Sequence, residues 1–554
     1  MDVRKVTESL LLSGIKRKLA QWGISREISF SVEIPRQEEH GDYSTNAAMQ
    51  LARHLGKKAR EVAMELVEAI REEDEKGWIA SLNVAGPGFI NIVLSDHAWR
   101  EVVATVLRKS ERFGSSETGK GTRVLIEFVS ANPTGPLHVG HGRGAAVGDA
   151  LSRLLSFEGY EVATEYYVND VGNQMDKLGR SLHVRYLQEC GIAADLPDDG
   201  YRGEYLAALA RDFRREEGER YAGVPEEEAL PVFRKVACDR ILDGIRMDLN
   251  DFRVGFHNWF REESLHREGG VSEAIEELEK RDLLYRSEGA VFFKSETHGD
   301  EKDRVLVRAD GRTTYFAADV AYHRRKYLKG YDRMIDIWGA DHHGYAPRMM
   351  AAMRGLGEDE NRLEILLVQF VTLVRDGKAV QMSTRSGEFT TLREVIDEVG
   401  VDAARFFYLL RSFHSHLDFD LTLAKTQSSE NPVYYIQYVH ARICSIFREA
   451  GSRGVFLSDN PHLSSLSLPD EVKLMKKVAR FPDVISEGAR QREPHRIPFY
   501  LLDLSREFHA FYQNHRFLGE APERTQARLA LAKAVKTVVS NGLSLIGVSA
   551  PESM

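Results

Sequence analysis

The sequence contains few cysteines and no long apolar segment. Only three of its 554 residues are cysteine, and Cys190, Cys238 and Cys444 lie far apart. This spacing fits neither a disulfide framework nor a zinc site, and it is typical of a protein in a reducing cytosol. No stretch approaches the apolar length that crosses a bilayer. Residues 1–20 carry charges throughout, unlike a secretory signal. We therefore expect a cytoplasmic protein without a membrane partner.

The chain also lacks an excess of basic charge. Its formal net charge is −9 and its pI is near 6.1. Proteins that coat nucleic acid without regard to sequence usually carry a basic surface, so the charge argues against that class. This net charge is still compatible with a nucleic-acid partner that binds through local patches.

The chain is long enough for several domains. It has a mass of 62.7 kDa, with 43% hydrophobic and 29% charged residues, the balance of a globular protein. We find no internal repeat and no low-complexity segment. Residues 1–110 mix an amphipathic helix with strand-like segments at 28–34 and 88–94. Residues 111–122, rich in Gly, Ser and charge, are predicted to be a linker.

Residues 123–390 have the pattern of a parallel α/β core. Residues 124–129 are almost continuously apolar, as in a parallel strand buried on both faces. Further apolar strands at 333–338 and 363–374 alternate with helical stretches, which predicts a doubly wound sheet. A charge-rich and mostly helical stretch near 190–300 is expected to be an insertion. Residues 391–554 show helical spacing throughout, which predicts an all-α bundle.

The most informative segment, 130–144, reads SANPTGPLHVGHGRG and lies between the first core strand and a helix. In open α/β sheets, ligands bind at the carboxyl ends of the strands. The free N–H groups at the N-terminus of the following helix can bind a phosphate. His138 and His141 are three residues apart and face one side, where they can donate hydrogen bonds to a phosphorus centre. Gly140 leaves the backbone bare, so an adenine ring can lie against it. On its own, such a segment is more often a glycine-rich turn with two solvated histidines.

The wider sequence resembles one enzyme family. The segment 138–141, HVGH, resembles the HIGH signature of class I aminoacyl-tRNA synthetases, with Val139 in place of isoleucine. The strings EFVSANP at 127–133, YVNDVGNQ at 167–174 and NPVYYIQYVHAR at 431–442 are similar to the arginine-specific branch. The resemblance covers nearly the whole chain and implies a Rossmann-type core, an α+β N-terminal domain that contacts tRNA, and an anticodon-binding helical domain. It also implies ATP, Mg²⁺, and attack of a carboxylate on the α-phosphate beside His138 and His141.

An acidic pocket for the substrate is predicted beside this turn. A guanidinium is a permanently charged planar fork, which carboxylates match best. Glu127 ends the first core strand, and Asp319 lies four residues after Tyr315, on the same helix face. Tyr315 can stack on the guanidinium or hydrogen-bond to it. The alternative is that Glu127 and Asp319 pair with protein arginines such as Arg324 or Arg143. The resemblance implies that the substrate arginine is held by Glu127, Ser130, Asn132, Tyr315 and Asp319.

The segment 339–344, GADHHG, resembles the family's loop beside the adenosine. An Asp-His-His triplet also suggests a metal, but no further ligand stands at metal spacing, so we predict no protein-held metal. The expected ATP-binding residues are Pro133, Thr134, His138, Gly140, His141, Asp341, His342, Gln381, Met382 and Ser383.

The second class I signature, KMSKS, is altered. The matching segment 380–387 reads VQMSTRSG, so Gln381 and Thr384 replace both lysines that neutralise the pyrophosphate. Arginine enzymes often lack this motif and are thought to compensate with a lysine just before HIGH, but residues 134–136 are Thr-Gly-Pro here. Our hypothesis is that Arg385, helped by Lys378, supplies the positive charge and acts as a catalytic residue.

Aromatic and basic residues on a predicted helix indicate where RNA binds. The helix at 433–447 has an apolar stripe, and Tyr435, Tyr438 and Arg442 lie partly off it. Exposed aromatic side chains beside an arginine suit stacking on splayed anticodon bases. The alternative is that the tyrosines pack the bundle. The resemblance adds Met554 at the anticodon, and Phe89 and Asn91 at the D-loop, although Phe89 is equally suited to the core of its strand.

The predicted activity is ATP-dependent ligation of L-arginine to its cognate tRNA through arginyl-adenylate, with release of AMP and pyrophosphate, by a monomeric enzyme. One rival is a non-catalytic tRNA-binding paralogue, suggested by the altered second motif. Another is a class I synthetase for glutamine, glutamate or cysteine. Glu127 and Asp319 would repel glutamate, and zinc-type ligands of a cysteine enzyme are missing. A small-molecule nucleotidyltransferase would leave the outer domains without a role.

Overall fold

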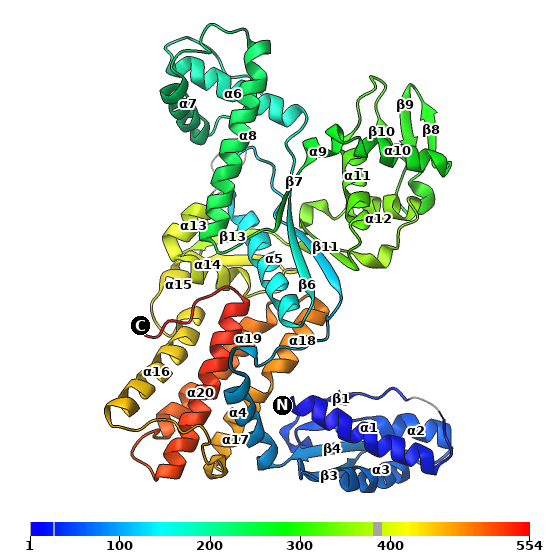
Figure 1. Cartoon of the computed structure of the whole chain (residues 1–554), viewed down its shortest axis with the longest axis vertical. Coiled ribbons are helices and arrows are strands. Elements are labelled where there is room, and N and C mark those ends of the chain that lie inside the picture. Colours follow the sequence, from blue (N-terminus) through cyan, green and yellow to red (C-terminus); the bar gives the residue numbers. More distant parts are fainter. Residues whose placement is uncertain (1, 26–27, 381–389) are drawn as a thin grey trace.

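A parallel sheet built from apolar segments forms the centre of the molecule. The computed structural model describes residues 2–25, 28–380 and 390–554. Within them, five parallel strands are hydrogen-bonded in the order β12-β11-β5-β6-β7. This arrangement confirms the predicted parallel-sheet core (Figure 1). The strands are β5 (Arg123–Phe128), β6 (Glu161–Val168), β7 (Asn258–Arg261), β11 (Arg333–Gly339) and β12 (Leu363–Val368).

Strand β5 is buried on both faces, because successive side chains point in opposite directions. Val124, Ile126 and Phe128 join the core that includes α5 (Val139–Phe157), and Phe128 packs against Gly148 of that helix. Leu125 belongs to a second core that includes α11 (Tyr315–Leu328). Helices therefore cover the sheet on both sides, as the uninterrupted apolar run of this strand predicts.

The stretch near 190–300 differs from a purely helical insertion. Residues 258–261 form β7, the edge strand of the parallel sheet next to β6. A four-residue strand inside a charged region is too short to reveal itself by periodicity. Before it, three helices project from the core, and after it a small antiparallel sheet of order β10-β9-β8 forms (Figure 1). The elements of this region are α6 (Asn173–Glu189), α7 (Glu204–Glu217), α8 (Glu226–Asp251), α9 (Glu262–Arg267), α10 (Gly270–Lys280), β8 (Leu284–Ser287), β9 (Ala290–Phe293), η3 (Glu296–His298) and β10 (Arg304–Val307).

The N-terminal part combines helices with a four-stranded sheet of order β1-β2-β4-β3. The strand predicted at 28–34 is reduced to Val32 and Glu33, because its partner has only three residues and Pro35 follows. The amide of Ser31 donates to Asn46 Oδ1 instead of a strand partner, at 3.2 Å. The elements are α1 (Val3–Gln21), β1 (Val32–Glu33), η1 (Glu38–His40), β2 (Tyr43–Thr45), α2 (Ala47–Leu55), α3 (Ala59–Glu73), β3 (Ile79–Ala85), β4 (Phe89–Leu94), α4 (Asp96–Lys109) and η2 (Ser110–Arg112).

The segment predicted as one strand at 363–374 is two strands in two sheets. Strand β12 ends at Val368, and β13 (Val371–Arg375) pairs with β15 (Leu417–Asp420) and β14 (Lys378–Ala379). The bend between them is held from α5 by Arg143, whose guanidinium donates to the carbonyls of Gln369 (2.8 Å) and Phe370 (3.4 Å). Between β11 and β12 lie η4 (Ala340–His342), α12 (Ala346–Gly355) and η5 (Glu360–Arg362).

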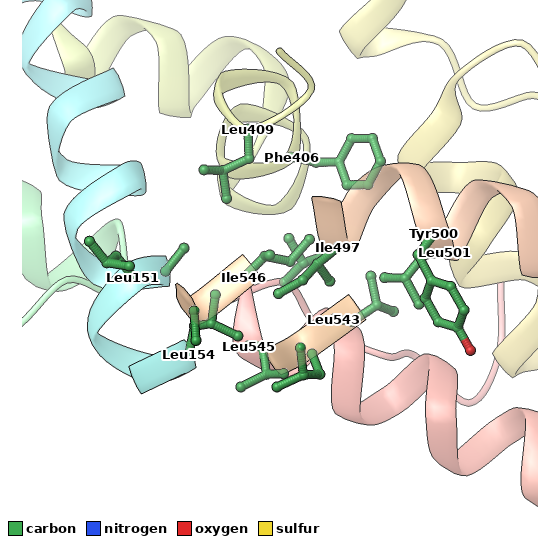
Figure 2. Packing of buried hydrophobic residues seen from close by; sticks show 14 of the residues in the cluster. Leu151, Leu154, Phe406, Leu409, Ile497, Tyr500, Leu501, Leu543, Leu545 and Ile546 are labelled. Atoms are coloured by element: carbon green, nitrogen blue, oxygen red, sulfur yellow. The ribbon is translucent and has the colours of Figure 1, made fainter. Parts of the chain in front are cut away.

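The C-terminal part is helical, as predicted, except that residues 417–420 form β15, which pairs with β13. Figure 2 shows Leu151 and Leu154 of α5 lying close to Leu545 and Ile546 at the end of the last helix, with Ile497 beside Ile546. This shared core ties the helix of the histidine motif to the bundle. The helices are α13 (Leu392–Val399), α14 (Val401–Tyr408), α15 (Leu421–Lys425), α16 (Pro432–Ser452), η6 (Leu463–Ser465), α17 (Pro469–Ala479), α18 (Phe481–Gln491), α19 (Arg496–Asn514) and α20 (Pro522–Leu545).

The segment predicted as a linker is packed against the bundle. Phe113 is buried, and Asn541 of α20 donates hydrogen bonds to the carbonyls of Ser110 (3.2 Å) and Phe113 (3.1 Å). Among the described residues, no helix has the length and apolarity needed to cross a membrane.

Candidate active site

The two histidines of the HVGH segment lie at the start of α5. His138 is the N-cap residue, and its Nδ1 accepts hydrogen bonds from the amides of Gly140 (3.1 Å) and His141 (3.4 Å). His141 Nδ1 accepts in turn from the amide of His138, at 3.2 Å. The two rings stack with centroids 3.6 Å apart. Because each Nδ1 is an acceptor, the hydrogen of each neutral ring is on Nε2, the atom that can donate to a phosphate.

Burial keeps both imidazoles uncharged at neutral pH. It lowers the pKa of His141 to about 3, with a further contribution from His138. Burial also lowers the pKa of His138, although Asp341 opposes this effect. The influence of Asp341 places the predicted adenosine loop beside the histidine turn. The two neutral imidazoles lie at the N-terminus of α5, which carries a partial positive charge. Donors in this position can stabilise the negative charge that develops on a phosphate.

The histidine turn is bonded directly to the chain that follows the second motif. An antiparallel bridge joins His138 to Thr391, the N-cap residue of α13. The amide of Val139 donates to the carbonyl of Thr390 (3.1 Å), and the amide of Leu392 donates to the carbonyl of Leu137 (2.7 Å). The predicted residues Gln381, Met382, Ser383 and Arg385 lie outside the described residues.

Carboxylates gather on the other side of the turn. Glu127 is the penultimate residue of β5 and is 5% exposed, and its Oε1 accepts from Ser130 Oγ at 2.8 Å. Asp319 accepts a hydrogen bond from the Tyr345 hydroxyl. Burial raises the pKa of Asp319, and the charge of Glu127 raises it further.

A third carboxylate, Glu262, completes this acidic cluster. It follows β7 directly, is buried, and accepts a hydrogen bond from the Tyr167 hydroxyl at 2.8 Å. Burial raises the pKa of Glu262 to about 7, and Asp319 contributes to the increase. Burial also raises the pKa of Tyr167, together with the charges of Asp319, Glu262 and Glu127. Three acids from separate strands and helices therefore surround one tyrosine, and such a cluster attracts a cation.

Glu127 does have a basic partner, but it is neither of the predicted arginines. The fully buried ammonium of Lys326 contacts Glu127 Oε2. Arg143 binds only carbonyls, and Arg324 lies 3.7 Å from Glu273.

The remaining predicted substrate residues lie around the cluster. Tyr315 begins α11 and is 47% exposed, and its hydroxyl lies against Gly172. Asn132 is exposed and donates to Gln174 Oε1 at 3.0 Å. In the turn itself Pro133 is buried and Thr134 half-buried, and the carbonyl of Thr134 accepts from the Tyr205 hydroxyl. His342 is exposed on η4, within 6.1 Å of the Trp338 ring.

An aromatic cluster occupies the junction of α16 and α19. The guanidinium of Arg442 lies between the rings of Tyr438 (4.3 Å) and Tyr512 (4.4 Å) and donates to the Tyr438 hydroxyl at 2.9 Å. His509 stacks on Tyr438 and is tilted against Tyr435. Tyr438 and Tyr512 are each 37% exposed, so this cluster presents aromatic faces to solvent.

Three predicted RNA-binding residues lie elsewhere. Phe89, at the start of β4, is 39% exposed, whereas Asn91 on the same strand is 8% exposed and accepts from Ser44 Oγ at 3.0 Å. Met554 is exposed at the end of a segment that α16 holds, since the carbonyl of Pro551 lies 2.8 Å from His440 Nδ1.

Comparison with known proteins assigns every part of this arrangement to one family. A model described as the class I (R) tRNA synthetase catalytic domain matches residues 102–407. The arginyl tRNA synthetase N terminal domain matches residues 9–94, and the DALR anticodon binding domain matches residues 436–554. The chain is also 49% identical to an arginine–tRNA ligase from Geobacter sp. (strain M21), with full coverage of both chains. The chain belongs to the arginyl-tRNA synthetase family.

Solved structures agree with this assignment. A structure described as an arginyl-tRNA synthetase from Campylobacter jejuni is 38% identical, covers 83% of this chain and all of its own, and has a TM-score of 0.77. The arginyl-tRNA synthetase of Thermus thermophilus, at 23% identity, has the same fold over the full length of both chains, with a TM-score of 0.76. The α/β core with an N-terminal domain and a helical C-terminal domain is therefore the class I fold of this family.

Several residues of these sites were absent from the sequence-based prediction. Glu262 has one usable signal, an acid two residues after the apolar pair Trp259–Phe260. Tyr345 follows the GADHHG segment by one residue. Nothing in the local sequence marks His509 or Tyr512 as neighbours of Arg442. Among the described residues, no group of three His, Cys, Asp or Glu side chains is placed to hold a metal.

Proposed function

We propose that this chain ligates L-arginine to its cognate tRNA in two steps, with ATP as the energy source. Arginine and ATP form arginyl-adenylate and pyrophosphate, and the terminal ribose hydroxyl of tRNA then attacks the acyl carbon and releases AMP. Membership in the arginyl-tRNA synthetase family supports an active ligase rather than a non-catalytic paralogue. We further propose that the enzyme is a monomer in the cytoplasm.

The chemistry is supported by a stacked pair of neutral imidazoles at the start of α5, and by Glu127 on the strand that leads into the same turn, to which Ser130 of the turn donates a hydrogen bond. Nε2 of His138 and His141 donates to the α-phosphate as negative charge develops during attack by the arginine carboxylate. Pro133, Thr134, Gly140, Asp341 and His342 line the adjoining nucleotide site. Mg²⁺ bound to the ATP phosphates supplies positive charge to the pyrophosphate, and Arg385 with Lys378 adds to it from the second motif.

The acidic cluster supports specificity for arginine. Glu127 and Asp319 match the two edges of a guanidinium, and Glu262 adds a third charge once it is ionised. Ser130 orients Glu127, Tyr345 orients Asp319, and Tyr315 and Asn132 border the entrance. A neutral side chain such as glutamine brings no positive charge to Asp319 and Glu262, which disfavours its binding.

The outer domains support recognition of tRNA. We propose that Tyr435, Tyr438, Arg442 and Met554 contact the anticodon, and that Phe89 and Asn91 contact the D-loop from the N-terminal domain. The exposed rings beside Arg442 provide faces on which bases stack. The proposed division is tRNA contact in residues 1–110, a connection at 111–122, catalysis in 123–390, and anticodon binding in 391–554.

A direct test is aminoacylation with total tRNA, ATP and a panel of amino acids that includes arginine, lysine, citrulline, glutamine and glutamate. We expect only arginine to be attached, together with arginine-dependent exchange of pyrophosphate into ATP when tRNA is present. Attachment of a different amino acid, or tRNA binding without attachment, would contradict the proposal.

A further inference from the structure

Three acidic residues stand side by side in the middle of the parallel sheet. Asp336 on β11 is in register with Glu127 on β5, and Glu127 is in register with Glu165 on β6. Their side chains are 0%, 5% and 1% exposed. Neighbouring strands are about 4.8 Å apart, so these carboxylates repel one another in a region from which water is excluded. A row of this kind needs compensating cations.

Helix α11 supplies the compensation. Lys326 contacts Glu127 Oε2 and lies 2.7 Å from Asp336 Oδ1. His323 contacts the second oxygen of Asp336 at 2.8 Å, and Lys329 contacts Glu165 at 2.8 Å. Burial raises the pKa of Asp336, but Lys326 and His323 outweigh it and leave this pKa lowered to about 2. Every acid of the row is therefore paired from the same helix.

Glu127 is the member of the row that the proposed function assigns to the substrate. One of its oxygens is fixed by Ser130 and the other by Lys326. Lys326 is 0% exposed and lies 4.5 Å from the centre of the Tyr322 ring, so it has no path to solvent or to a ligand. It belongs to the helix that also carries Tyr315 and Asp319, and it anchors that helix to Glu127.

We propose that Lys326 is a positioning residue for the substrate arginine: it fixes the orientation of the Glu127 carboxylate by tying it to the helix that carries Asp319. This inference rests on the proposed function, because it assumes that Glu127 binds the guanidinium. Lys326 touches no substrate. It sets the distance between the two carboxylates by joining β5 to α11, while Asp336 holds the ammonium from the opposite side. Removal of the ammonium leaves two buried acids in contact and displaces Glu127.

The test compares the KM for arginine in aminoacylation by the full-length protein and its variants. We expect Lys326→Met to raise this KM on the order of tenfold or more, because an angstrom of displacement is enough for such an effect. The KM for ATP and kcat should change by less than about twofold. Lys329→Met is the matched control, since it removes an ion pair from the same helix at Glu165 and should leave the KM for arginine unchanged.

A double-mutant cycle with Glu127→Gln separates positioning from a general structural role. If Lys326 acts through Glu127, Lys326→Met adds nothing to the KM for arginine in the Glu127→Gln background. Effects that multiply, or a Lys326→Met enzyme with the parental KM, would overturn the proposal. The double variant has one buried acid fewer than Lys326→Met, and Asp336 keeps its contact with His323, so its comparison with Glu127→Gln decides the question even if Lys326→Met alone does not fold. An unchanged KM in Glu127→Gln itself would overturn the arginine site instead.

Discussion

The amide nitrogen of Val139 lies 3.1 Å from the carbonyl oxygen of Thr390 and donates a hydrogen bond to it. The amide of Leu392 donates a second hydrogen bond, to the carbonyl of Leu137, at 2.7 Å. Residues 381–389, which carry the altered second motif, end directly before Thr390. Residues 390–392, which follow the second motif in the chain, are therefore hydrogen-bonded to the histidine turn.

Removal of His141 should slow activation without weakening arginine binding. The His141→Ala variant loses the Nε2 donor and the acceptor that fixes the His138 amide. We expect kcat for arginine-dependent ATP–pyrophosphate exchange to fall by about 100-fold or more, because loss of a preorganised donor to a developing charge has this effect. The KM for arginine should stay within about threefold of the parent. A parental kcat would contradict the assigned role.

Arginine binding should strengthen as the pH rises through 7. Glu262 has a pKa of about 7 because burial raises it, so this carboxyl is mostly neutral at pH 6 and charged at pH 8. Tyr167, Asp319, Asp170 and His266 surround it. We expect the KM for arginine to fall about fivefold between pH 6 and pH 8. The Glu262→Gln variant should lose this dependence, and a parental profile in that variant would assign the titration to another group.

The same ionisation has a cost in stability. The folded-state pKa of Glu262 exceeds its ordinary value of 4.5, so its contribution is fully present below pH 4.5 and is lost as the pH rises through 7. The melting temperature of Glu262→Gln should therefore rise relative to that of the parent as the pH increases from 6 to 8. This measurement provides a control on the kinetic profile.

The Arg143 guanidinium should be irreplaceable by lysine. It is fully buried and donates to the carbonyls of Gln369 and Ser412, and burial lowers its pKa to about 10. Lysine lacks the fork that reaches both segments, so Arg143→Lys should lower stability by roughly 2–4 kcal/mol. Chemical denaturation measures this change. Arg153→Lys, on the same helix but partly exposed, should cost far less, and an equal loss would contradict the expectation.

The Arg442 cluster should determine affinity for tRNA. Arg442→Ala removes the side chain that holds Tyr438 and Tyr512 in place. We expect the KM for tRNA to rise about tenfold, with little change in the KM for arginine. Arg453→Ala is the control, because Arg453 caps the same helix and, within the part of the chain that the structure describes, its acidic partner is Glu449 on the surface. Equal effects of the two substitutions would indicate general electrostatic attraction instead of stacking.

The altered second motif should still contribute positive charge. We expect Arg385→Ala to lower kcat of ATP–pyrophosphate exchange by roughly 10- to 100-fold, because the leaving pyrophosphate loses a counter-charge. Lys378→Ala should have a smaller effect. Unchanged exchange by Arg385→Ala, measured with tRNA present, would remove this residue from the mechanism.

The local sequence pattern was sufficient to predict features that depend on residues adjacent in the chain. The apolar run at 124–129 predicted a doubly covered strand, and the spacing of His138 and His141 predicted that both face one site. Both are confirmed by the burial of β5 and the stacked rings. The pattern failed at 28–34, where a short partner strand limits pairing, and at 363–374, where contacts from distant Arg143 and Phe413 bend the chain.

The sequence by itself determined the family, the strand–turn–helix with its two histidines, the order of domains and the helical character of the C-terminal part. Only the tertiary structure decided that β7 joins the core sheet, that Glu262 follows it into the acidic cluster, and that Lys326 rather than an arginine pairs with Glu127. The reason is physical: periodicity records which face of an element is apolar, whereas the partner of a buried charge depends on which strands lie side by side.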